Sequence, residues 1–500
     1  MPSAVPIAHG RSSSAPASIE GDSGILLPAN RFYDEESQRI SNLIDEELRK
    51  ESQRQKEARR KQVKVMLLGQ AESGKSTLQK QFQIYYASKS LDRERPSWKP
   101  IVHFNIIRAV KTMLDEIDYE LSHPEDEDSG VDSDPDLNEP GPSSAGPSSS
   151  TSSSAQRQHQ KPRQPSAAPR DIFRPSSTEL ETLSVLRTRL LPLVALHDSL
   201  ASELSGGVSL SRGLTGVFVR AGWQGLLQSN QGARAGKGSA GGVVGLAAKA
   251  LDSSREDIQA LWAHGAVKKL IQMRKLRLEE SAPFFLDHIA RIAEPDYLPN
   301  VDSFFGPAAD DVLNVRLQTL GVIEHSFPIN LGGTMYDWRL YDVGGARGMR
   351  HAWVPYFEDA TAIIFLAPIS AFDQYLEEDP RTNRIDDSLQ LFTAICSNKL
   401  LKKAHLVLML NKTDILKAKL KAGIRVQKYI TSYGNRPNKY DDVASYFRAH
   451  FMQVHKRKDV SNRSLYLHFT SMLDIKATQS IIVNVGEAII RQHVAQTGLT

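Results

Sequence analysis

The sequence predicts an α/β fold in which a mostly parallel sheet, with helices on both faces, is interrupted by an all-helical insert. An apolar strand runs into a glycine-rich loop and then a helical pattern between Lys64 and Leu78. Beyond Leu320, short apolar runs alternate with helical segments, whereas most of the chain between these two regions has helical periodicity. Strands that alternate with helices are typical of a parallel sheet covered on both faces.

The segment Lys64–Leu78 reads KVMLLGQAESGKSTL and contains the spacing GxxxxGKS. In such a loop, Gly69 and Gly74 let the backbone N–H groups point inward, Lys75 reaches terminal phosphates, and the Ser76 hydroxyl ligates magnesium. A chance glycine loop before a helix is the alternative. The preceding strand, the Lys-Ser pair and the following helix together favour a nucleoside triphosphate site.

The strands and helices of the sheet region follow from local periodicity. We expect strands at Tyr336–Val343, Ala362–Ala367, Leu406–Leu410 and Leu465–Phe469, and helices at Ser388–Ile395, Ile415–Ile424 and Gln479–Ala495. The nucleotide domain would then comprise residues 63–90 and 312–500, with the helical domain at 91–311.

The N-terminal part of the chain predicts a long helix at residues 33–62 after a disordered stretch at 1–32. This region is charged from Asp34 on and has a narrow apolar stripe of Ile40, Leu43, Ile44 and Leu48. The stripe indicates either a docking helix or a solvated helix held by local ion pairs.

Inside the helical domain, a helix is expected at Ile101–Ile117, and two flexible insertions are expected at about 122–178 and 205–245. The first is acidic and then rich in Ser, Pro and Gln, and the second is rich in Gly and Ser. Either insertion is a docking or phosphorylation tail, or simply a tolerated insertion.

Composition limits the classes of partner and compartment. The 62 basic and 58 acidic residues nearly balance, so no overall field favours nucleic acid. Cys396 is the only cysteine, which excludes an intramolecular disulfide and a cysteine zinc cluster and fits a reducing compartment. No apolar run is long enough for a membrane span, and no secretory signal is expected.

Two further motifs lie where predicted strands end. Asp342 precedes Val343, Gly344 and Gly345, an arrangement in which a carboxylate holds the water shell of magnesium; the alternative is a plain strand end and turn. Residues 411–414 read NKTD after the LVLML strand.

The NKTD motif places a carboxylate, Asp414, where it could accept two hydrogen bonds from guanine, which adenine cannot donate. An ATP-using enzyme is therefore disfavoured. Helix capping by Asp414 is the competing interpretation.

Taken together, these residues resemble the alpha subunits of heterotrimeric G proteins. The resemblance is carried by GQAESGKST (69–77), RPSWKP (95–100), ESAPFFLD (280–287), DYLP (296–299), RLQTLG (316–321), DVGGAR (342–347) and NKTD (411–414). It implies a GTPase domain with an inserted helical domain, a bound GTP or GDP with Mg²⁺, a beta-gamma dimer on the N-terminal helix and switch regions, and exchange driven by a seven-helix receptor.

The resemblance also implies roles for individual residues. Ser76 and Thr319 would ligate magnesium, with Asp342 behind it through water, and Arg316 would be an arginine finger supplied in cis, for which this family is the standing example. The expected nucleotide-binding residues are Glu72, Ser73, Gly74, Lys75, Ser76, Thr77, Glu280, Ser281, Leu313, Asn314, Val315, Arg316, Leu317, Gln318, Thr319, Asp342, Val343, Gly344, Gly345, Ala346, Asn411, Lys412, Thr413, Asp414 and Met472.

Two departures from the family pattern affect hydrolysis. Ala346 stands where the family has the glutamine of DVGGQR, and a methyl group cannot orient the attacking water. Ala71 replaces the middle glycine of the phosphate loop, which would place a methyl near the terminal phosphate. We expect weak hydrolysis; compensation by other residues is the alternative.

Other departures affect partners. Met349 replaces an acidic switch residue, which puts locking of the switch in doubt, and Met472 replaces a smaller alanine beside the base, which would loosen the nucleotide. Pro2 replaces the myristoylated glycine and no cysteine lies nearby, so we expect no N-terminal lipid anchor. Thr500 replaces the family's terminal hydrophobic residue.

The expected location is the cytoplasm and the cytoplasmic face of the plasma membrane, through a heterotrimer. A non-catalytic scaffold that recruits partners through the insertions is the alternative function.

Overall fold

The computed structural model describes residues 29–123, 173, 175–205, 217–219, 222–223, 225, 242–300 and 311–497. The chain divides into two compact units, Met1–Lys61 and Gln62–Thr500. Nearly all of the N-terminal stretch predicted to be disordered, most of the insertion predicted at 122–178, and the last three residues lie outside the described residues.

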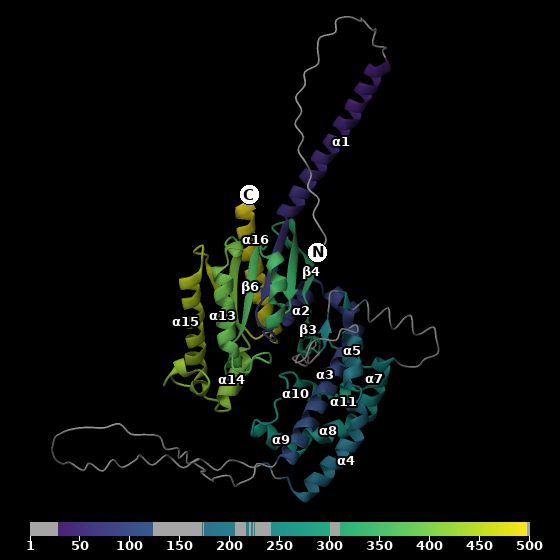
Figure 1. Ribbon diagram of the computed structural model, residues 1–500, viewed down its shortest axis with the longest axis vertical. Helices are drawn as coiled ribbons and strands as arrows, with labels where there is room; N and C mark the ends of the chain where they lie inside the picture. The colour runs from purple at the N-terminus through teal and green to yellow at the C-terminus, as the bar shows by residue number, and fades with distance from the viewer. Residues whose placement is uncertain are drawn as a thin grey trace, which may run out of the picture. The chain divides into compact units, whose positions relative to one another are not determined.

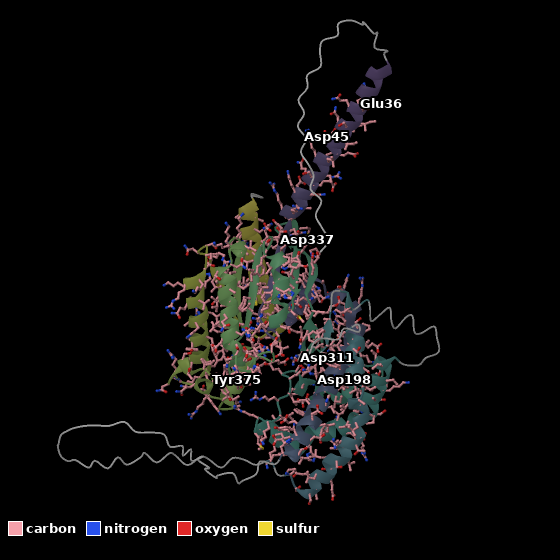
Figure 2. All side chains as sticks on the ribbon, viewed as in Figure 1. Glu36, Asp45, Asp198, Asp311, Asp337 and Tyr375 are labelled. Carbon is pink, nitrogen blue, oxygen red and sulfur yellow. The ribbon has the colours of Figure 1, made fainter. Side chains whose placement is uncertain are left out.

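The first unit contains helix α1 (Ala29–Arg60), which is free of Gly and Pro. It starts before the predicted residue 33 and ends before the predicted residue 62, because Gln62 already pairs with Asp337 in the sheet. Figure 2 shows charged side chains, among them Glu36 and Asp45, along this helix. The apolar stripe from Ile40 to Leu48 is present and its members are 51–63% exposed.

The second unit is built on one six-stranded sheet with the order β4-β5-β1-β6-β7-β8. Its strands are β1 (Gln62–Leu68), β4 (Val322–Leu331), β5 (Thr334–Val343), β6 (Ala362–Pro368), β7 (His405–Asn411) and β8 (Leu465–Phe469). All neighbouring pairs are parallel except β4 and β5, which are antiparallel. The predicted mostly parallel sheet is thus confirmed.

Strand β4 was not predicted from the sequence. Its burial alternates irregularly because it lies at the sheet edge and only part of it packs on the core. Pro328 lies in this strand, as an edge position allows.

Helices cover both faces of the sheet (Figure 1). The flanking helices are α2 (Lys75–Tyr86) and α16 (Ile475–Thr497) on one face, and α13 (Arg384–Ser397), α14 (Thr413–Lys421) and α15 (Tyr440–Lys458) on the other. Phe82 and Ile482 pack in one core with Val65, whereas Phe392 and Phe447 pack in the other with Phe365. Helix α15 was not predicted.

Short 3-10 helices connect several of these elements: η2 (Arg347–Tyr356), η3 (Ile369–Asp373), η4 (Lys399–Leu401), η5 (Val426–Lys428) and η6 (Thr431–Tyr433). Among the described helices of the whole chain, none combines the length and apolar character needed to cross a membrane.

The inserted region has its own hydrophobic core. Its helices are α3 (Ser88–Ser122), α4 (Ser177–Val194), α5 (His197–Leu204), α7 (Val243–Ser253), α8 (Arg255–Ala263), α9 (Gly265–Gln272), α10 (Ala282–Asp287), α11 (Ile289–Ile292) and α12 (Asp311–Asn314). Helix α3 is longer than the predicted Ile101–Ile117 and begins at Ser88, ahead of the predicted domain boundary at 90. Helix α4 starts at a capping box formed by Ser176 and Glu179, which fixes its first residue.

The prediction of a wholly flexible segment at 205–245 is wrong for its centre. Strand β2 (Phe218–Val219) pairs in parallel with β3 (Gln318–Thr319), and Val217 and Trp223 are 2% and 6% exposed. The insert is therefore not entirely helical. The prediction used the average composition of the segment, in which Gly and Ser outnumber the apolar residues. The few apolar residues at its centre can nevertheless bury enough surface to be ordered.

Candidate functional site

A cavity of about 650 Å³ lies where loops at the carboxyl ends of β1, β5 and β7 meet residues of the helical insert. This volume falls within the range of pockets that bind small ligands. The predicted residues on its wall are Glu72, Gly74, Lys75, Ser76, Thr77, Glu280, Ser281, Leu313, Asn314, Val315, Arg316, Leu317, Gln318, Thr319, Val343, Gly345, Ala346, Asn411, Lys412, Asp414 and Met472. Four other predicted residues, Ser73, Asp342, Gly344 and Thr413, lie outside the wall.

The glycines of the phosphate loop are required by geometry. Gly69 has φ +144° and a Cβ there would lie 2.4 Å from the carbonyl oxygen of Leu366. Gly74 has φ +100° and a Cβ would lie 2.3 Å from Asn411 Nδ2. Any side chain larger than the hydrogen atom of glycine would collide with backbone or with a buried amide. The backbone of this loop therefore requires glycine at both positions, which argues against a chance occurrence of the two glycines.

Lys75 is the first residue of α2, and its ammonium group is held inside the loop. It donates to the carbonyl oxygens of Gly69 at 3.0 Å and Gln70 at 2.7 Å. Burial lowers the pKa of Lys75 to about 8, although the nearby Asp342 carboxylate opposes this change. A Cβ on Gly345 would lie 2.5 Å from Lys75 Nζ, so the missing side chain at Gly345 leaves room around the ammonium group.

Three oxygen-bearing side chains meet beside Lys75. The hydroxyls of Ser76 and Thr319 are 3.2 Å apart and donate to the same oxygen of Asp342, at 2.7 and 2.9 Å. The other oxygen of Asp342 is buried and has no partner among the described residues. Magnesium prefers oxygen ligands, so this set of donors fits the ion. No group of three or more His, Cys, Asp or Glu side chains in the described part of the chain could hold a metal.

The NKTD loop is joined to the phosphate loop and to the helical insert. Asn411 donates to the carbonyl oxygen of Ser73 at 2.8 Å and accepts from Thr470 at 3.1 Å. Lys412 has a left-handed backbone with φ 65° and forms an ion pair with Glu280 of the insert. Asn411 and Lys412 both line the cavity, and their contacts join its wall to the phosphate loop and to the helical insert.

Asp414 lies in the first turn of α14 with an exposed side chain. The N-cap position of this helix is Lys412, which makes no side-chain capping bond, so the alternative that Asp414 is the cap residue is wrong. Thr413 is buried and donates to the carbonyl oxygen of Thr470 at 3.2 Å. Met472 is 4% exposed, and its side chain packs into the core under the sheet besides touching the cavity.

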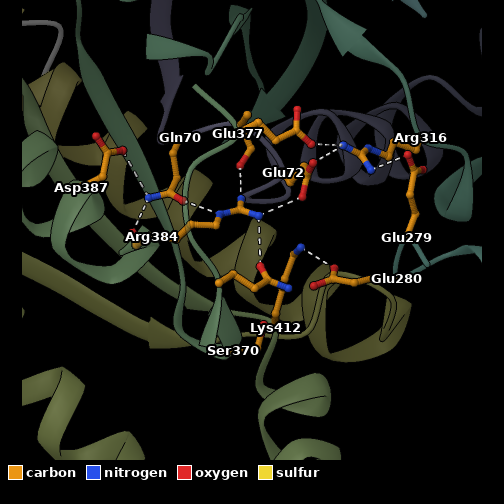
Figure 3. Close-up of polar contacts among 12 residues, drawn as sticks. Gln70, Glu72, Glu279, Glu280, Arg316, Ser370, Glu377, Arg384, Asp387 and Lys412 are labelled. Atoms are coloured by element: carbon orange, nitrogen blue, oxygen red, sulfur yellow. Dashed lines mark hydrogen bonds and ion pairs between the residues drawn. The ribbon is translucent and has the colours of Figure 1, made fainter. Parts of the chain in front are cut away.

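Both ends of the Arg316 guanidinium group are occupied by carboxylates (Figure 3). One nitrogen lies 2.6 Å from Glu279 of the helical insert, and another forms an ion pair with Glu72 of the phosphate loop. Burial opposes the charge on Arg316, but Glu72 and Glu279 outweigh burial and raise its pKa. The backbone of Arg316 exchanges two hydrogen bonds with the Asn105 side chain, at 2.8 and 3.0 Å.

Arg384 lies on the other side of Glu72 and was not predicted as a site residue (Figure 3). It donates to Gln70 at 2.9 Å, to the Ala71 carbonyl oxygen at 2.5 Å and to Glu72 at 2.9 Å. Burial opposes the charge on Glu72, but Arg316, Arg384 and Lys412 lower its pKa to about 2.

Several further residues on the wall were missed, including Asn105, Arg108, Glu279, Gln374 and Glu377. No local motif marks Asn105, Arg108, Gln374 or Glu377, and only the tertiary arrangement brings them to the phosphate loop. Glu279 is next to the predicted Glu280, so a reading of both acids on that loop could have found it.

The segment after β5 is held by side chains of its own. The sulfur of Met349 lies near Gly344. Met349 replaces the family's acidic residue, so this position has no carboxylate that could pair with a basic side chain. The adjacent Arg350 instead forms two hydrogen bonds with the buried Asp387, at 3.0 and 2.6 Å. Trp353 donates from its indole nitrogen to the Gly344 carbonyl oxygen at 2.9 Å.

Ala71 and Ala346 both line the cavity. Neither side chain carries a hydrogen-bonding atom, so neither can orient a water molecule there.

The fold and site define a nucleotide-binding protein of the phosphate-loop class, with an inserted helical domain. A family profile described as "G-protein alpha subunit" matches residues 38–489. The chain is 31% identical to the guanine nucleotide-binding protein alpha-4 subunit of Mycosarcoma maydis, in an alignment covering 87% of this chain and 83% of that protein.

It is also 34% identical to the alpha-17 subunit of Caenorhabditis elegans, over 48% of this chain and 64% of that protein. The chain belongs to the G-protein alpha subunit family, whose members are guanine-nucleotide-binding GTPases of signal transduction that work with beta-gamma dimers, receptors and effectors.

Proposed function

We propose that this chain is a signalling switch that binds GTP with magnesium and hydrolyses it slowly. The observation that carries the proposal is the cavity wall at Ala346 and Ala71. Ala346 replaces the family glutamine that orients the attacking water, and the methyl group of Ala71 would occupy space that the water and the arginine finger need. Arg316, the finger residue, is at the same time held by two carboxylates.

Binding would use the groups gathered around the phosphate loop. The backbone from Glu72 to Thr77 and the Lys75 ammonium would hold the phosphates, and Asp414 would accept hydrogen bonds from guanine. Ser76, Thr319 and Asp342 would hold magnesium, which would neutralise negative charge on the phosphates.

In hydrolysis, a water oxygen attacks the terminal phosphorus and the bond to the bridging oxygen breaks. The protons of the water pass to the oxygens of the released inorganic phosphate, and GDP is the leaving group. The protein contributes position and electrostatic stabilisation, because the phosphoryl group needs little covalent help. Loss of one transition-state contact typically costs about 100-fold to 1,000-fold in rate, and two losses in one apparatus need not multiply.

Single-turnover phosphate release tests the slow-hydrolysis proposal. The double variant Ala71→Gly/Ala346→Gln should release phosphate at least about 100-fold faster than the natural chain. Met335→Gln, an exposed position on β5, is the matched control and should change nothing. Equal rates for the natural chain and the double variant would refute impaired hydrolysis.

The Lys75→Ala substitution distinguishes a nucleotide-dependent switch from the alternative of a non-catalytic scaffold. This change should abolish binding of a non-hydrolysable GTP analogue and, if the chain is a switch, its cellular function as well. Retained cellular function without nucleotide binding would favour the scaffold. Competition of bound GTP by ATP would instead indicate an ATP-using enzyme.

The partners in this proposal are a beta-gamma dimer, a seven-helix receptor and an effector of unknown identity. The exposed apolar stripe of α1, from Ile40 to Leu48, is the surface offered to beta-gamma. Location at the cytoplasmic face of the plasma membrane would then depend on these partners. Fractionation of cells that lack beta-gamma, the receptor or both checks this, and membrane association that survives the loss of both would contradict it.

A further inference from the structure

Strand β2 joins the helical insert directly to the magnesium half of the site. The carbonyl oxygen of Val217 accepts from the N–H of Gln318, and that of Val219 accepts from the N–H of Leu320, both at 2.9 Å. The two bonds flank Thr319, whose hydroxyl lies beside Ser76 and Asp342. Thr319 is therefore held on both sides along the backbone.

The same stretch is also fixed from its opposite side. Gly344, two residues after Asp342 in the chain, donates its N–H to the carbonyl oxygen of Gly321 at 2.9 Å. A Cβ on Gly344 would lie 2.6 Å from the Thr319 carbonyl oxygen, so the two backbones pass closely. Residues 318–321 thus lie between β2 and the segment after β5.

Strand β2 is itself anchored in the insert. Val217 and Val219 are each 2% exposed and belong to the hydrophobic core of the helical insert. The N–H of Phe218 donates to the Ser205 hydroxyl, just after α5, at 3.2 Å. The position of Thr319 is accordingly coupled to the packing of the insert.

A second anchor follows four residues later. The rings of Trp223 and Trp98 meet edge to face at 4.9 Å, and Lys80 of α2 lies over Trp98 at 4.5 Å. Lys80 also donates to the carbonyl oxygens of Val312 and Val315, in the stretch that leads to Arg316. Trp223 is therefore linked, through Trp98 and Lys80, to the stretch that leads to Arg316.

We propose that residues 217–219 are a positioning strand that holds Thr319 in place for magnesium, so that the insert slows nucleotide release through the metal. This inference rests on the proposed magnesium and nucleotide site. Burial of the apolar side chains of this strand stabilises its pairing with residues 318–320. Residues 217–219 lie outside the family motifs at 69–77 and 342–347.

The test measures release of a fluorescent, non-hydrolysable GTP analogue from the full chain, in millimolar magnesium and again in excess EDTA. Val217→Asp/Val219→Asp forces two carboxylates into an apolar core and should expel the strand. We expect the slowing of release by magnesium to fall about tenfold, which corresponds to about 1.4 kcal/mol, while the rate in EDTA stays the same. Loss of two net hydrogen bonds has this order of magnitude.

Trp223→Ala is a milder second variant, in case the double variant does not fold, and should reduce the magnesium effect in the same direction. Leu261→Ala, in the same core but on α8, is the matched control and should leave the magnesium effect intact. Hydrogen exchange provides a readout of the pairing itself: the amides of Gln318 and Leu320 should be protected in the natural chain and lose protection in both strand variants.

An unchanged magnesium effect in the strand variants would overturn the inference. So would release that accelerates equally in magnesium and EDTA, since that result means general weakening of the insert. If the natural chain binds no guanine nucleotide at all, the proposed function fails first, and the inference fails with it.

Discussion

The Glu72→Gln substitution tests whether the arginine-rich cluster around the phosphate loop stabilises the fold. Glu72 faces Arg316 and Arg384, and Lys412 lies close enough to add to their effect. These cations lower the pKa of Glu72 from its ordinary 4.5 to about 2. At about 1.36 kcal/mol per pH unit, the charged carboxylate contributes about 3 kcal/mol to the free energy of unfolding at neutral pH.

The pH dependence follows from the direction of this change. Because the pKa of Glu72 is lower in the folded protein than in the unfolded chain, its contribution is full above about pH 4.5 and is lost as the pH falls towards 2. Glu72→Gln should therefore lower the free energy of unfolding by about 3 kcal/mol at pH 7 and by about 2 kcal/mol at pH 3.5.

Urea unfolding of nucleotide-stripped protein at several pH values measures this difference. Glu377→Gln is the matched control, because Glu377 lines the same cavity while burial and repulsion by Glu72 raise its pKa. Its removal should cost no stability at neutral pH. A Glu72→Gln effect that is below about 0.5 kcal/mol, or that does not decrease at acidic pH, would refute the reasoning.

Two further predictions concern groups of the same site. Burial lowers the pKa of Lys75 to about 8, so Lys75 should take up a proton when phosphates bind: almost none at pH 6.5 and about half a proton at pH 8. Calorimetry of GDP binding in buffers of different ionisation enthalpy measures this proton uptake. No uptake at pH 8 would contradict the prediction. Asp387→Asn leaves Arg350 without its buried counter-charge and should destabilise the segment after β5 by about 2 kcal/mol. The emission of Trp353, isolated by comparison with Trp353→Phe variants, should then shift to the red, and an unchanged spectrum would count against this role.

Local chemistry determined the parts of the fold and site that are contiguous in the chain. Residues 69–77 form a phosphate loop because two glycines, a lysine and a serine at fixed spacing can adopt one particular backbone between a strand and a helix. Apolar periodicity likewise predicted β1, β5, β6, β7 and β8. Apolar periodicity did not predict the half-exposed edge strand β4, because only part of this strand packs on the core and its apolar residues do not alternate regularly.

Long-range contacts were decided only by the tertiary structure. Arg384 and Glu72 meet because β1 and β6 are neighbours in the sheet and Arg384 begins α13, the helix that follows β6, which no spacing along the chain could indicate. Strand β2 lies in a segment whose average composition predicts flexibility, yet the apolar side chains of this region pack in the hydrophobic core of the helical insert. Composition and periodicity indicate which secondary structure a segment prefers in isolation, whereas burial against distant parts of the chain decides which structure it adopts in the folded protein.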